Sequence, residues 1–148
     1  MTLIFERATE SDEKNILSLL KVNMKKLFRE NFGGWSDETS KKQFNTISNK
    51  GYTYVVKNDD ELIGYVSFYS EEEVFVLNDI QIKKEFQQKG YGEKVLEFVE
   101  GKVKKLSGNK IRLLVFKNNP ALKFYEKHNY KHINYEERNN TCEMLKQF

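Results

Sequence analysis

The hydrophobic and polar positions of the chain follow two different periods on either side of one glycine turn. Val74–Ile82 is dense in β-branched and aromatic residues and is too short for an ordinary helix, which predicts a buried strand. The turn Gln87–Gly92 comes next. After the turn, apolar residues recur at spacings of three and four, as in an amphipathic helix, at Val95, Val99, Val103 and Leu106. The pattern therefore predicts a strand, a glycine turn and a helix in succession.

The same patterns extend over the rest of the chain. Ile111–Phe116 is a second buried strand, and its connection through the helix predicts parallel pairing with the strand at Val74. Asn119 is expected to cap a helix that has Pro120 in its first turn and ends near Asn129. Further strands are predicted at Leu3–Ala8, Tyr52–Val56, Leu62–Phe68, Tyr130–Tyr135 and Thr141–Phe148.

The first third of the chain predicts two helices with Gly33 and Gly34 between them. The first helix is expected from about Asp12 to Met24, and Ser36 has the features of a cap for the second. Two interpretations stay open for the aromatic residues of this segment. They either form the wall of a substrate pocket or pack beneath the two helices: Phe28, Phe32 and Trp35.

Length and composition favour one globular domain over residues 1–148. Hydrophobic residues make up 39% of the chain and aromatic residues 14%, which is enough for a sizeable core. No apolar run is long enough to span a membrane, and the first residues lack the pattern of a secretory signal, so we expect a cytoplasmic protein. The single Cys142 excludes an internal disulfide and is expected to be a packed strand residue.

The net charge of +3 is mild, and the lysines are scattered in pairs. Because nucleic-acid-binding proteins concentrate basic residues on one face or in a known motif, binding to DNA or RNA is not expected. Lys83, Lys84 and Lys89 flank the glycine turn and are either ordinary exposed lysines or groups that steer a polyanion toward it. The acidic run Glu71–Glu73 is either a solvated loop or, at the mouth of a pocket, a feature that favours a cationic acceptor.

The glycine turn has the chemistry of a phosphate-binding site. The first amides of a helix lack partners within it and carry partial positive charge, so an anion is stabilised there. Gly90 and Gly92 allow unusual dihedral angles and bring no Cβ between ligand and backbone. Val95 stands where a dinucleotide fingerprint has its third glycine, and the Gly-Lys-Ser/Thr of a P-loop is absent. A tight strand-to-helix turn without a ligand remains the alternative on spacing alone.

Two motifs together resemble the GNAT superfamily of acyl-CoA-dependent N-acetyltransferases. The first is Gln87-x-x-Gly90-x-Gly92 after a strand, and the second is Asn118-x-x-Ala121-x-x-Phe124-Tyr125-Glu126-Lys127. Asn129-Tyr130 stands where this family usually has Gly-Phe. The resemblance implies an α+β (α/β) fold with a mixed central sheet of about seven strands and about four flanking helices. It also implies a splayed cofactor cleft between the fourth and fifth strands.

The resemblance further implies acetyl-CoA as cosubstrate and no metal. The amides of Gln88 to Gly92 would hold the pyrophosphate, and the pantetheine arm would lie between the two splayed strands as a pseudo-strand. Main-chain groups at Ile80 and Ile82 would bind this arm on one side, and the Asn118 side chain on the other. The cofactor-binding residues expected by resemblance are Ile80, Gln81, Ile82, Gln87, Gln88, Lys89, Gly90, Tyr91, Gly92 and Asn118.

The chemistry of amine acetylation requires a base more than an acid. An amine with a pKa of about 10.4 must lose a proton near neutral pH, whereas a thiol with a pKa of about 8.5 leaves more easily. Asp79, an acid inside an apolar strand, is either the base, directly or through water, or a carboxylate that bonds local donors at a strand irregularity. By resemblance, Tyr125 protonates the departing thiolate; by pattern alone it is a core aromatic. His128 is expected to be a capping or surface residue.

Two functions from different classes stay open at this point. The first is an N-acetyltransferase that moves the acetyl group of acetyl-CoA directly to a primary amine of a small molecule or peptide. The second is a non-catalytic acyl-CoA sensor or protein-interaction module on the same fold. Exposed sheet edges are compatible with a homodimer.

Overall fold

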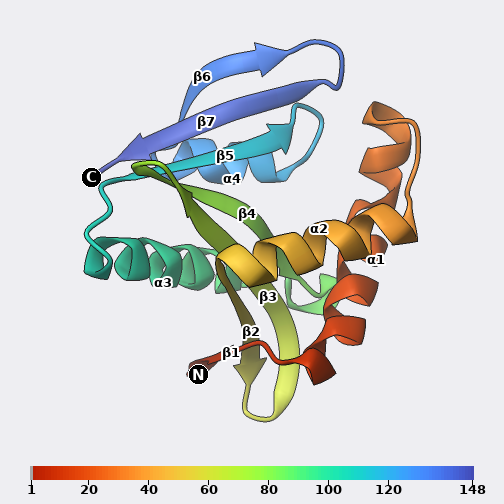
Figure 1. Ribbon diagram of the computed structural model, residues 1–148, viewed down its shortest axis with the longest axis vertical. Helices are drawn as coiled ribbons and strands as arrows, with labels where there is room; N and C mark the ends of the chain where they lie inside the picture. Colours follow the sequence, from red (N-terminus) through yellow and green to blue (C-terminus); the bar gives the residue numbers. More distant parts are fainter. Residues whose placement is uncertain (1) are drawn as a thin grey trace.

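The computed structural model describes residues 2–148, and its centre is a seven-stranded sheet (Figure 1). The strand order is β1-β2-β3-β4-β5-β7-β6, and every neighbouring pair is antiparallel except β4 and β5, which are parallel. The predicted mixed sheet and the parallel pair are therefore confirmed. The strands are β1 Leu3–Arg7, β2 Tyr52–Asn58, β3 Glu61–Glu71, β4 Val74–Ile82, β5 Lys110–Phe116, β6 Lys131–Glu136 and β7 Thr141–Gln147.

Four α-helices accompany the sheet: α1 Glu13–Asn31, α2 Asp37–Lys50, α3 Tyr91–Lys105 and α4 Ala121–Lys127. The predicted cap of α2 is confirmed, because the Ser36 hydroxyl accepts a hydrogen bond from the Thr39 amide at 3.1 Å. The prediction that the first helix ends near Met24 is wrong. The helix continues for two more turns because Phe28 adds a further apolar contact, and it ends just before Gly33, whose φ is +86°.

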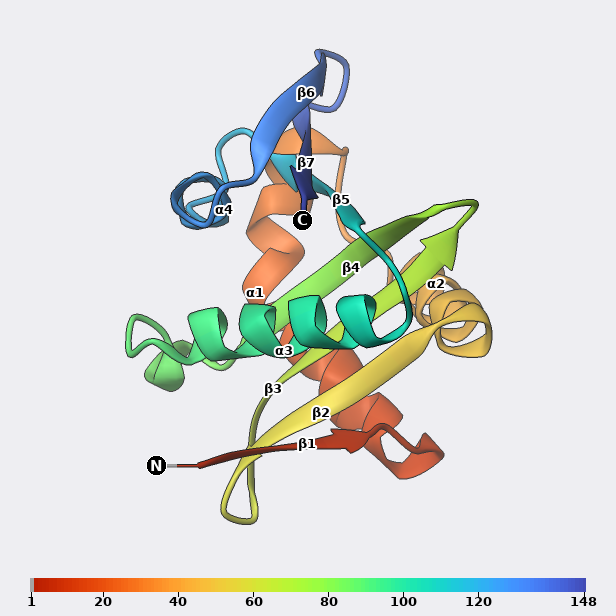
Figure 2. The ribbon, with the colours of Figure 1, turned by 90° about the vertical axis from the view of Figure 1, so that its left-hand side faces the viewer.

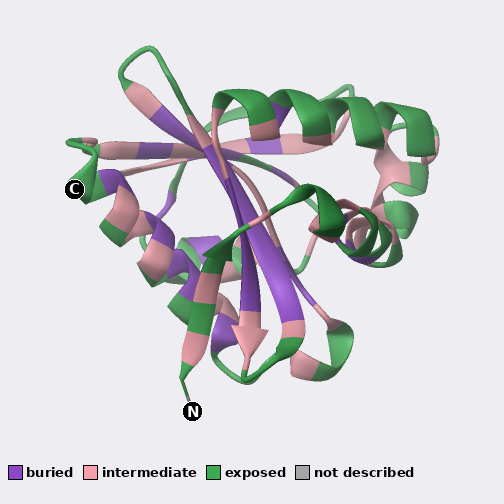
Figure 3. Cartoon of the chain, turned by 60° about the horizontal axis from the view of Figure 1, so that its bottom comes forward, coloured by how far each residue is buried: buried purple, intermediate pink, exposed green. Residues whose placement is uncertain are grey.

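The helices cover the two faces of the sheet unequally (Figure 2). α3 and α4 lie on one face, and α1 and α2 lie on the other. The larger core lies under α3, where Val95 and Val99 are fully buried against strand residues such as Val66 and Leu113. Buried positions accordingly run along the central strands, whereas the outer helix faces are exposed (Figure 3). A smaller core joins α1 to the other face, and it consists of Ile16, Leu19, Val55 and Tyr65.

The parallel pairing of β4 with β5 is short. It covers only Phe75–Leu77 of β4 and Ile111–Leu113 of β5. A β-bulge at Asn78 bends β4 where the pairing stops, since Ser67 of β3 pairs with Asp79 and the next residue pairs with Leu77. Beyond this point β5 turns away from β4 (Figure 2). We call the region between residues 78–82 and residues 114–116 the splay, and its presence between the fourth and fifth strands confirms the prediction.

The C-terminal part of the chain also folds as predicted. The Asn119 side chain accepts a hydrogen bond from the Ala121 amide at 2.9 Å, which caps α4. Asn129, just after α4, has a left-handed φ of +72°. Cys142 is a buried residue of β7 that packs in the main core. No helix within residues 2–148 is long and apolar enough to cross a membrane.

Candidate active site

The turn between β4 and α3 presents the start of the helix to solvent. Gly90 precedes the helix with a φ of +86°, and a Cβ added there would meet no atom within 4 Å. The helical hydrogen bonds of α3 begin with the bond from the Lys94 amide to the Gly90 carbonyl at 3.4 Å, so the preceding amides lie ahead of this ladder. Gln87 holds the turn against β4, because its Nε2 donates to the Ile82 carbonyl at 2.9 Å. The backbone therefore has the form of an anion site.

The side chains predicted around this turn take different places. The Tyr91 ring is buried beside Phe86, so the groups of Tyr91 that can face a ligand are those of its main chain. Lys84, which precedes the turn, is exposed, and so are Gln87, Gln88 and Lys89 within it. Gln88 has a φ of +59°.

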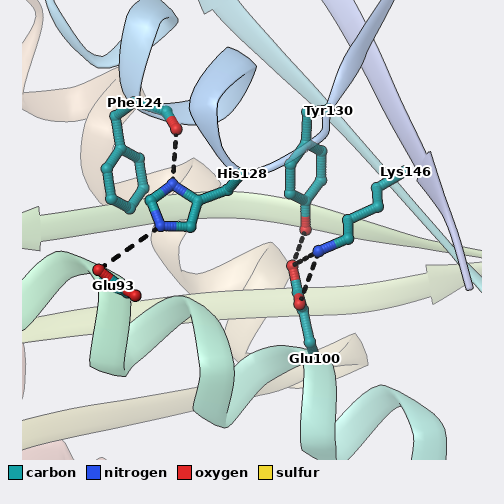
Figure 4. Close-up of polar contacts among 6 residues, drawn as sticks. All are labelled: Glu93, Glu100, Phe124, His128, Tyr130 and Lys146. Carbon is teal, nitrogen blue, oxygen red and sulfur yellow. Dashed lines mark hydrogen bonds and ion pairs between the residues drawn. The ribbon is translucent and has the colours of Figure 1, made fainter.

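α4 packs against the first turn of α3. A Cβ on Gly92 would lie 3.6 Å from the Phe124 ring, which is an ordinary van der Waals distance. His128 connects the two helices: its Nδ1 lies 2.8 Å from the Phe124 carbonyl oxygen and its Nε2 lies 3.8 Å from the Glu93 carboxylate (Figure 4). Because a carbonyl oxygen only accepts, Nδ1 carries the hydrogen. The expectation of a capping histidine therefore agrees with this contact.

The middle of α3 is fixed to the last strand by a polar cluster. Glu100 accepts hydrogen bonds from the Lys146 ammonium at 3.0 and 3.1 Å and from the Tyr130 hydroxyl at 2.9 Å (Figure 4). The charged side chains of Glu100 and Lys146 are only 13% and 20% exposed. This cluster holds the helix that begins at the glycine turn in a fixed position on the sheet.

One wall of the splay is the free edge of β4. Successive residues of an antiparallel strand direct their main-chain groups alternately to either side. The Lys83 amide donates to the Ile63 carbonyl of β3, so the main-chain groups of Ile82 and Ile80 point away from β3 and into the splay. The Ile82 carbonyl already accepts from Asn23 at 3.0 Å and from Gln87. Within residues 2–148, the groups at this edge for which no partner is seen are the Ile82 amide and both main-chain groups of Ile80.

The other wall of the splay is the end of β5 and the residue Asn118. The Asn118 Oδ1 accepts from Asn31 at 2.8 Å, and its Nδ2 donates to Glu30 at 3.3 Å. Phe28 packs edge-on against Phe116 with ring centroids 5.5 Å apart. α1 therefore contacts both walls, through Asn23 on the β4 side and through these residues on the β5 side.

The aromatic residues of α1 and the loop after it form one cluster. Phe28 also contacts Phe32 and Trp35, at centroid distances of 5.9 and 5.2 Å. Phe28 packs beneath the helices, as the second interpretation of these aromatic residues expects, whereas Phe32 remains 57% exposed.

Glu71, in the acidic run at the end of β3, forms an ion pair with Arg112 of β5 at 3.7 Å.

Asp79 lies next to the bulge, at the start of the splay. Its carboxylate accepts hydrogen bonds from the Tyr65 hydroxyl at 2.5 Å and from the Gln81 Nε2 at 2.6 Å. Burial disfavours the charged form and raises the pKa of Asp79 from 3.8 to about 6, although the two hydrogen bonds act in the opposite direction. The donors to this carboxylate are side chains and not the local backbone groups considered from the sequence.

Tyr125 projects from α4 with its ring buried. Burial and the nearby charge of Asp79 both raise the pKa of Tyr125, so the phenol keeps its proton at neutral pH, as a general acid must. Within residues 2–148 its hydroxyl has no hydrogen-bond partner. The structure thus places a carboxyl group with a raised pKa of about 6 and a protonated phenol within electrostatic reach of each other.

Sequence reasoning missed Tyr65 and Asn23. Asn23 continues the apolar stripe of α1 that includes Ile16 and Leu19, and a polar residue in such a stripe is a signal of a buried polar contact. Tyr65 gave no such signal, because an aromatic residue is ordinary in a strand. Gln81 was expected to bind the cofactor, whereas both ends of its side chain are used within the protein, by Asp79 and Asn23.

The sequence matches a known protein family over most of its length. Residues 21–130 match the family described as the acetyltransferase (GNAT) family. The chain belongs to this acetyltransferase family. The match includes α3, α4 and the splay of this GNAT domain. No curated protein matches its sequence.

Solved structures share the fold of this GNAT domain over its full length. The PaiA N-acetyltransferase of Thermoplasma acidophilum, in complex with coenzyme A, has a TM-score of 0.82 at 18% identity, with 100% of both chains covered. An acetyltransferase of Bacillus subtilis in complex with CoA has a TM-score of 0.78 at 17% identity, with 99% of both chains covered. A GNAT acetyltransferase of Elizabethkingia anophelis with bound acetyl-CoA has a TM-score of 0.73 at 16% identity, covering 99% of this chain and 98% of that one.

Proposed function

We propose that this protein transfers the acetyl group of acetyl-CoA directly to a primary amine of a small molecule or peptide. The observation that carries the proposal is the meeting of three features at the splay. These are a helix start with the form of an anion site, a strand edge with unused main-chain groups, and the pair Asp79 and Tyr125. Membership of the acetyltransferase family supports the same reaction class.

The thioester would bind along the line from the glycine turn to the splay. The amides of Gln88 to Gly92 would hold the diphosphate, and the open space above Gly90 leaves room for it. The main-chain groups of Ile80 and the amide of Ile82 would bind the pantetheine arm in the manner of an added strand. On the other wall Asn118 already bonds Asn31 and Glu30, and the second hydrogen of its Nδ2 would donate to the arm.

The reaction itself needs one proton removed and one supplied. The amine nitrogen attacks the thioester carbonyl, a carbon–nitrogen bond forms, and the carbon–sulfur bond breaks. Deprotonating an amine of pKa about 10.4 near pH 7 costs about 4 to 5 kcal/mol, and Asp79, with its pKa of about 6, is the group that accepts this proton, directly or through water. The Tyr125 hydroxyl then protonates the departing thiolate.

A non-catalytic acyl-CoA sensor is the second candidate, and one observation favours it. Both oxygens of Asp79 already accept hydrogen bonds, so the carboxylate has a structural function whether or not it receives a proton. The two candidates differ in one measurable property. An enzyme releases CoA faster when an acceptor is present, whereas a sensor binds acetyl-CoA without acceptor-dependent release.

The test is a free-thiol assay with acetyl-CoA and a panel of polyamines, amino acids, aminoglycosides and lysine peptides. Cys142 is buried, so the protein itself should add little to the thiol signal. Calorimetry with acetyl-CoA runs in parallel. The expected result is binding together with release that depends on at least one primary amine. Tight binding without release for any amine favours the sensor, and the absence of binding refutes both candidates.

A further inference from the structure

Four side chains from three elements form one continuous hydrogen-bonded chain beside the splay. Tyr65 of β3 donates to one oxygen of Asp79, and the Gln81 Nε2 donates to the other. The Gln81 Oε1 in turn accepts from the Asn23 Nδ2 of α1 at 3.0 Å. The same Asn23 nitrogen donates to the Ile82 carbonyl at 3.0 Å. This hydrogen-bond network therefore runs from the Ile82 main-chain carbonyl to the Asp79 carboxylate and the Tyr65 phenol.

The main-chain carbonyl fixes the direction of every hydrogen bond up to Asp79. A carbonyl oxygen only accepts, so the end of Asn23 that faces Ile82 must be its NH₂ group. That NH₂ group requires an oxygen at the near end of Gln81, and this leaves the NH₂ group of Gln81 to face Asp79. A flipped amide at either position would place two donors or two acceptors against each other. The network thus presents only a donor to this side of Asp79.

Tyr65 presents a donor on the other side. It is 2% exposed, and both burial and the charge of Asp79 raise its pKa well above the usual value of 10.0. The phenol therefore keeps its proton over the working pH range and donates to the carboxylate. If the Asp79 oxygen that faces Tyr65 carried a proton, two O–H groups would point at each other across a single hydrogen bond. The geometry favours an ionised Asp79, whereas its burial favours the protonated form.

We propose that Tyr65 and Asn23 are positioning residues of the acetyl transfer, which hold Asp79 ionised and in one orientation, Tyr65 directly and Asn23 through Gln81. This inference rests on the proposed function, because it assigns Asp79 the part of the base. The titratable groups that act on Asp79 from the elements around it are Tyr65 of β3 and Tyr125 of α4. No cation within residues 2–148 forms an ion pair with it. Its titration is therefore controlled by burial and by its two neutral hydrogen-bond donors, Tyr65 and Gln81.

The first test needs no acceptor and no turnover. The carboxyl carbon of Asp79 is followed by NMR in protein labelled at the carboxyl carbons of its five aspartates, and its signal is assigned by its loss in Asp79→Asn. Tyr65→Phe is expected to raise the midpoint of titration by about one to two pH units, the effect of losing one hydrogen bond to a charged group. Tyr69→Phe, which changes another tyrosine of β3, is the control and should leave it in place. Asn23→Ala is expected to produce a smaller upward shift.

The second test measures turnover against pH with the amine that gives the highest rate in the acceptor panel. Tyr65→Phe is expected to lower kcat about 5-fold to 50-fold near pH 6 and to recover toward the wild-type value near pH 9, where Asp79 is ionised in both proteins. The dissociation constant for acetyl-CoA should not change. A loss of kcat that is equal at every pH would mean a merely structural contribution of Tyr65, and would overturn the inference.

The two tests separate failure of this inference from failure of the proposed function. If no amine is acetylated but the midpoint of Asp79 rises in Tyr65→Phe, the network exists and the proposed reaction is wrong. If an amine is acetylated but neither variant moves the midpoint, the reaction stands and the positioning residues are wrong. If Tyr65→Phe fails to fold, Asn23→Ala decides, because Asn23 lies only partly buried on α1.

Discussion

Replacing Lys146 by methionine should lower the free energy of unfolding by more than the loss of an exposed lysine does. Its ammonium group makes two hydrogen bonds to Glu100, and these bonds connect α3 to β7 across 46 residues of sequence. Methionine keeps the length and apolar part of the side chain but removes the charge. Glu100 is then left as a carboxylate, 13% exposed, with the Tyr130 hydroxyl as its remaining partner in this cluster. The destabilisation arises chiefly from this uncompensated charge.

The magnitude follows from the burial of the pair. Exposed ion pairs contribute about 0.2 to 1 kcal/mol, and breaking a fully buried pair costs about 3 to 5 kcal/mol. At exposures of 13% and 20%, the loss of unfolding free energy in Lys146→Met should be about 2 to 3 kcal/mol. For a chain of this length each kcal/mol lowers Tm by about 2 to 4 °C, so we expect Tm to fall by about 4 to 12 °C.

Urea denaturation and calorimetry of Lys146→Met, Glu100→Gln and the double variant measure this effect. Lys105→Met, at an exposed position of α3, the helix that carries Glu100, is the control and should stay within about 0.5 kcal/mol of the wild type. The double variant should be less destabilised than the sum of the two single variants, because neither charge is left alone. A loss below about 0.5 kcal/mol in Lys146→Met, or additive single effects, would refute the reasoning.

Three further predictions concern the site. Tyr125→Phe should lower kcat by a factor of about 10² to 10⁴ with unchanged acetyl-CoA affinity in calorimetry, and unchanged turnover would remove Tyr125 as the acid. Gly90→Ala should lose about 1 kcal/mol of unfolding free energy in urea, because φ at this position is +86°, and it should weaken acetyl-CoA binding. Gly92→Ala, whose Cβ would lie 3.6 Å from the Phe124 ring, should keep the stability of the wild type. Equal stabilities of the two variants would contradict the left-handed conformation assigned to Gly90. The pKa of Asp79 in the folded state, about 6, exceeds its ordinary value of 3.8, so its contribution to stability is complete below about pH 4 and is lost as pH rises through about 6. Asp79→Asn should remove this part of the pH dependence. If its unfolding free energy varied between about pH 4 and pH 7 as that of the wild type does, the pKa of Asp79 would not be raised in the folded protein.

The sequence by itself determined the elements whose signals are local. β4 begins and ends at the predicted residues, Val74 and Ile82, because a run of β-branched and aromatic residues between turns has few other conformations available. Ser36 and Asn119 cap the helices that they were expected to cap, since a cap depends on a bond only two or three residues long. The paired motifs around Gly90 and Tyr125 identified the family for the same reason. The placement of Asp79 in a strand next to a bulge was likewise open to sequence reasoning.

Only the tertiary structure decided which side chains meet. The bond from Asn23 to Gln81 spans 58 residues, and the bond from Asn31 to Asn118 spans 87. Such partners depend on the register of β3 against β4 and on the path of α1 across the sheet, which no local pattern specifies. For the same reason the length of α1 was underestimated, because its last turns are stabilised by contact with the end of β5. The sequence thus predicted an acid in a strand, and the fold decided which donors surround it.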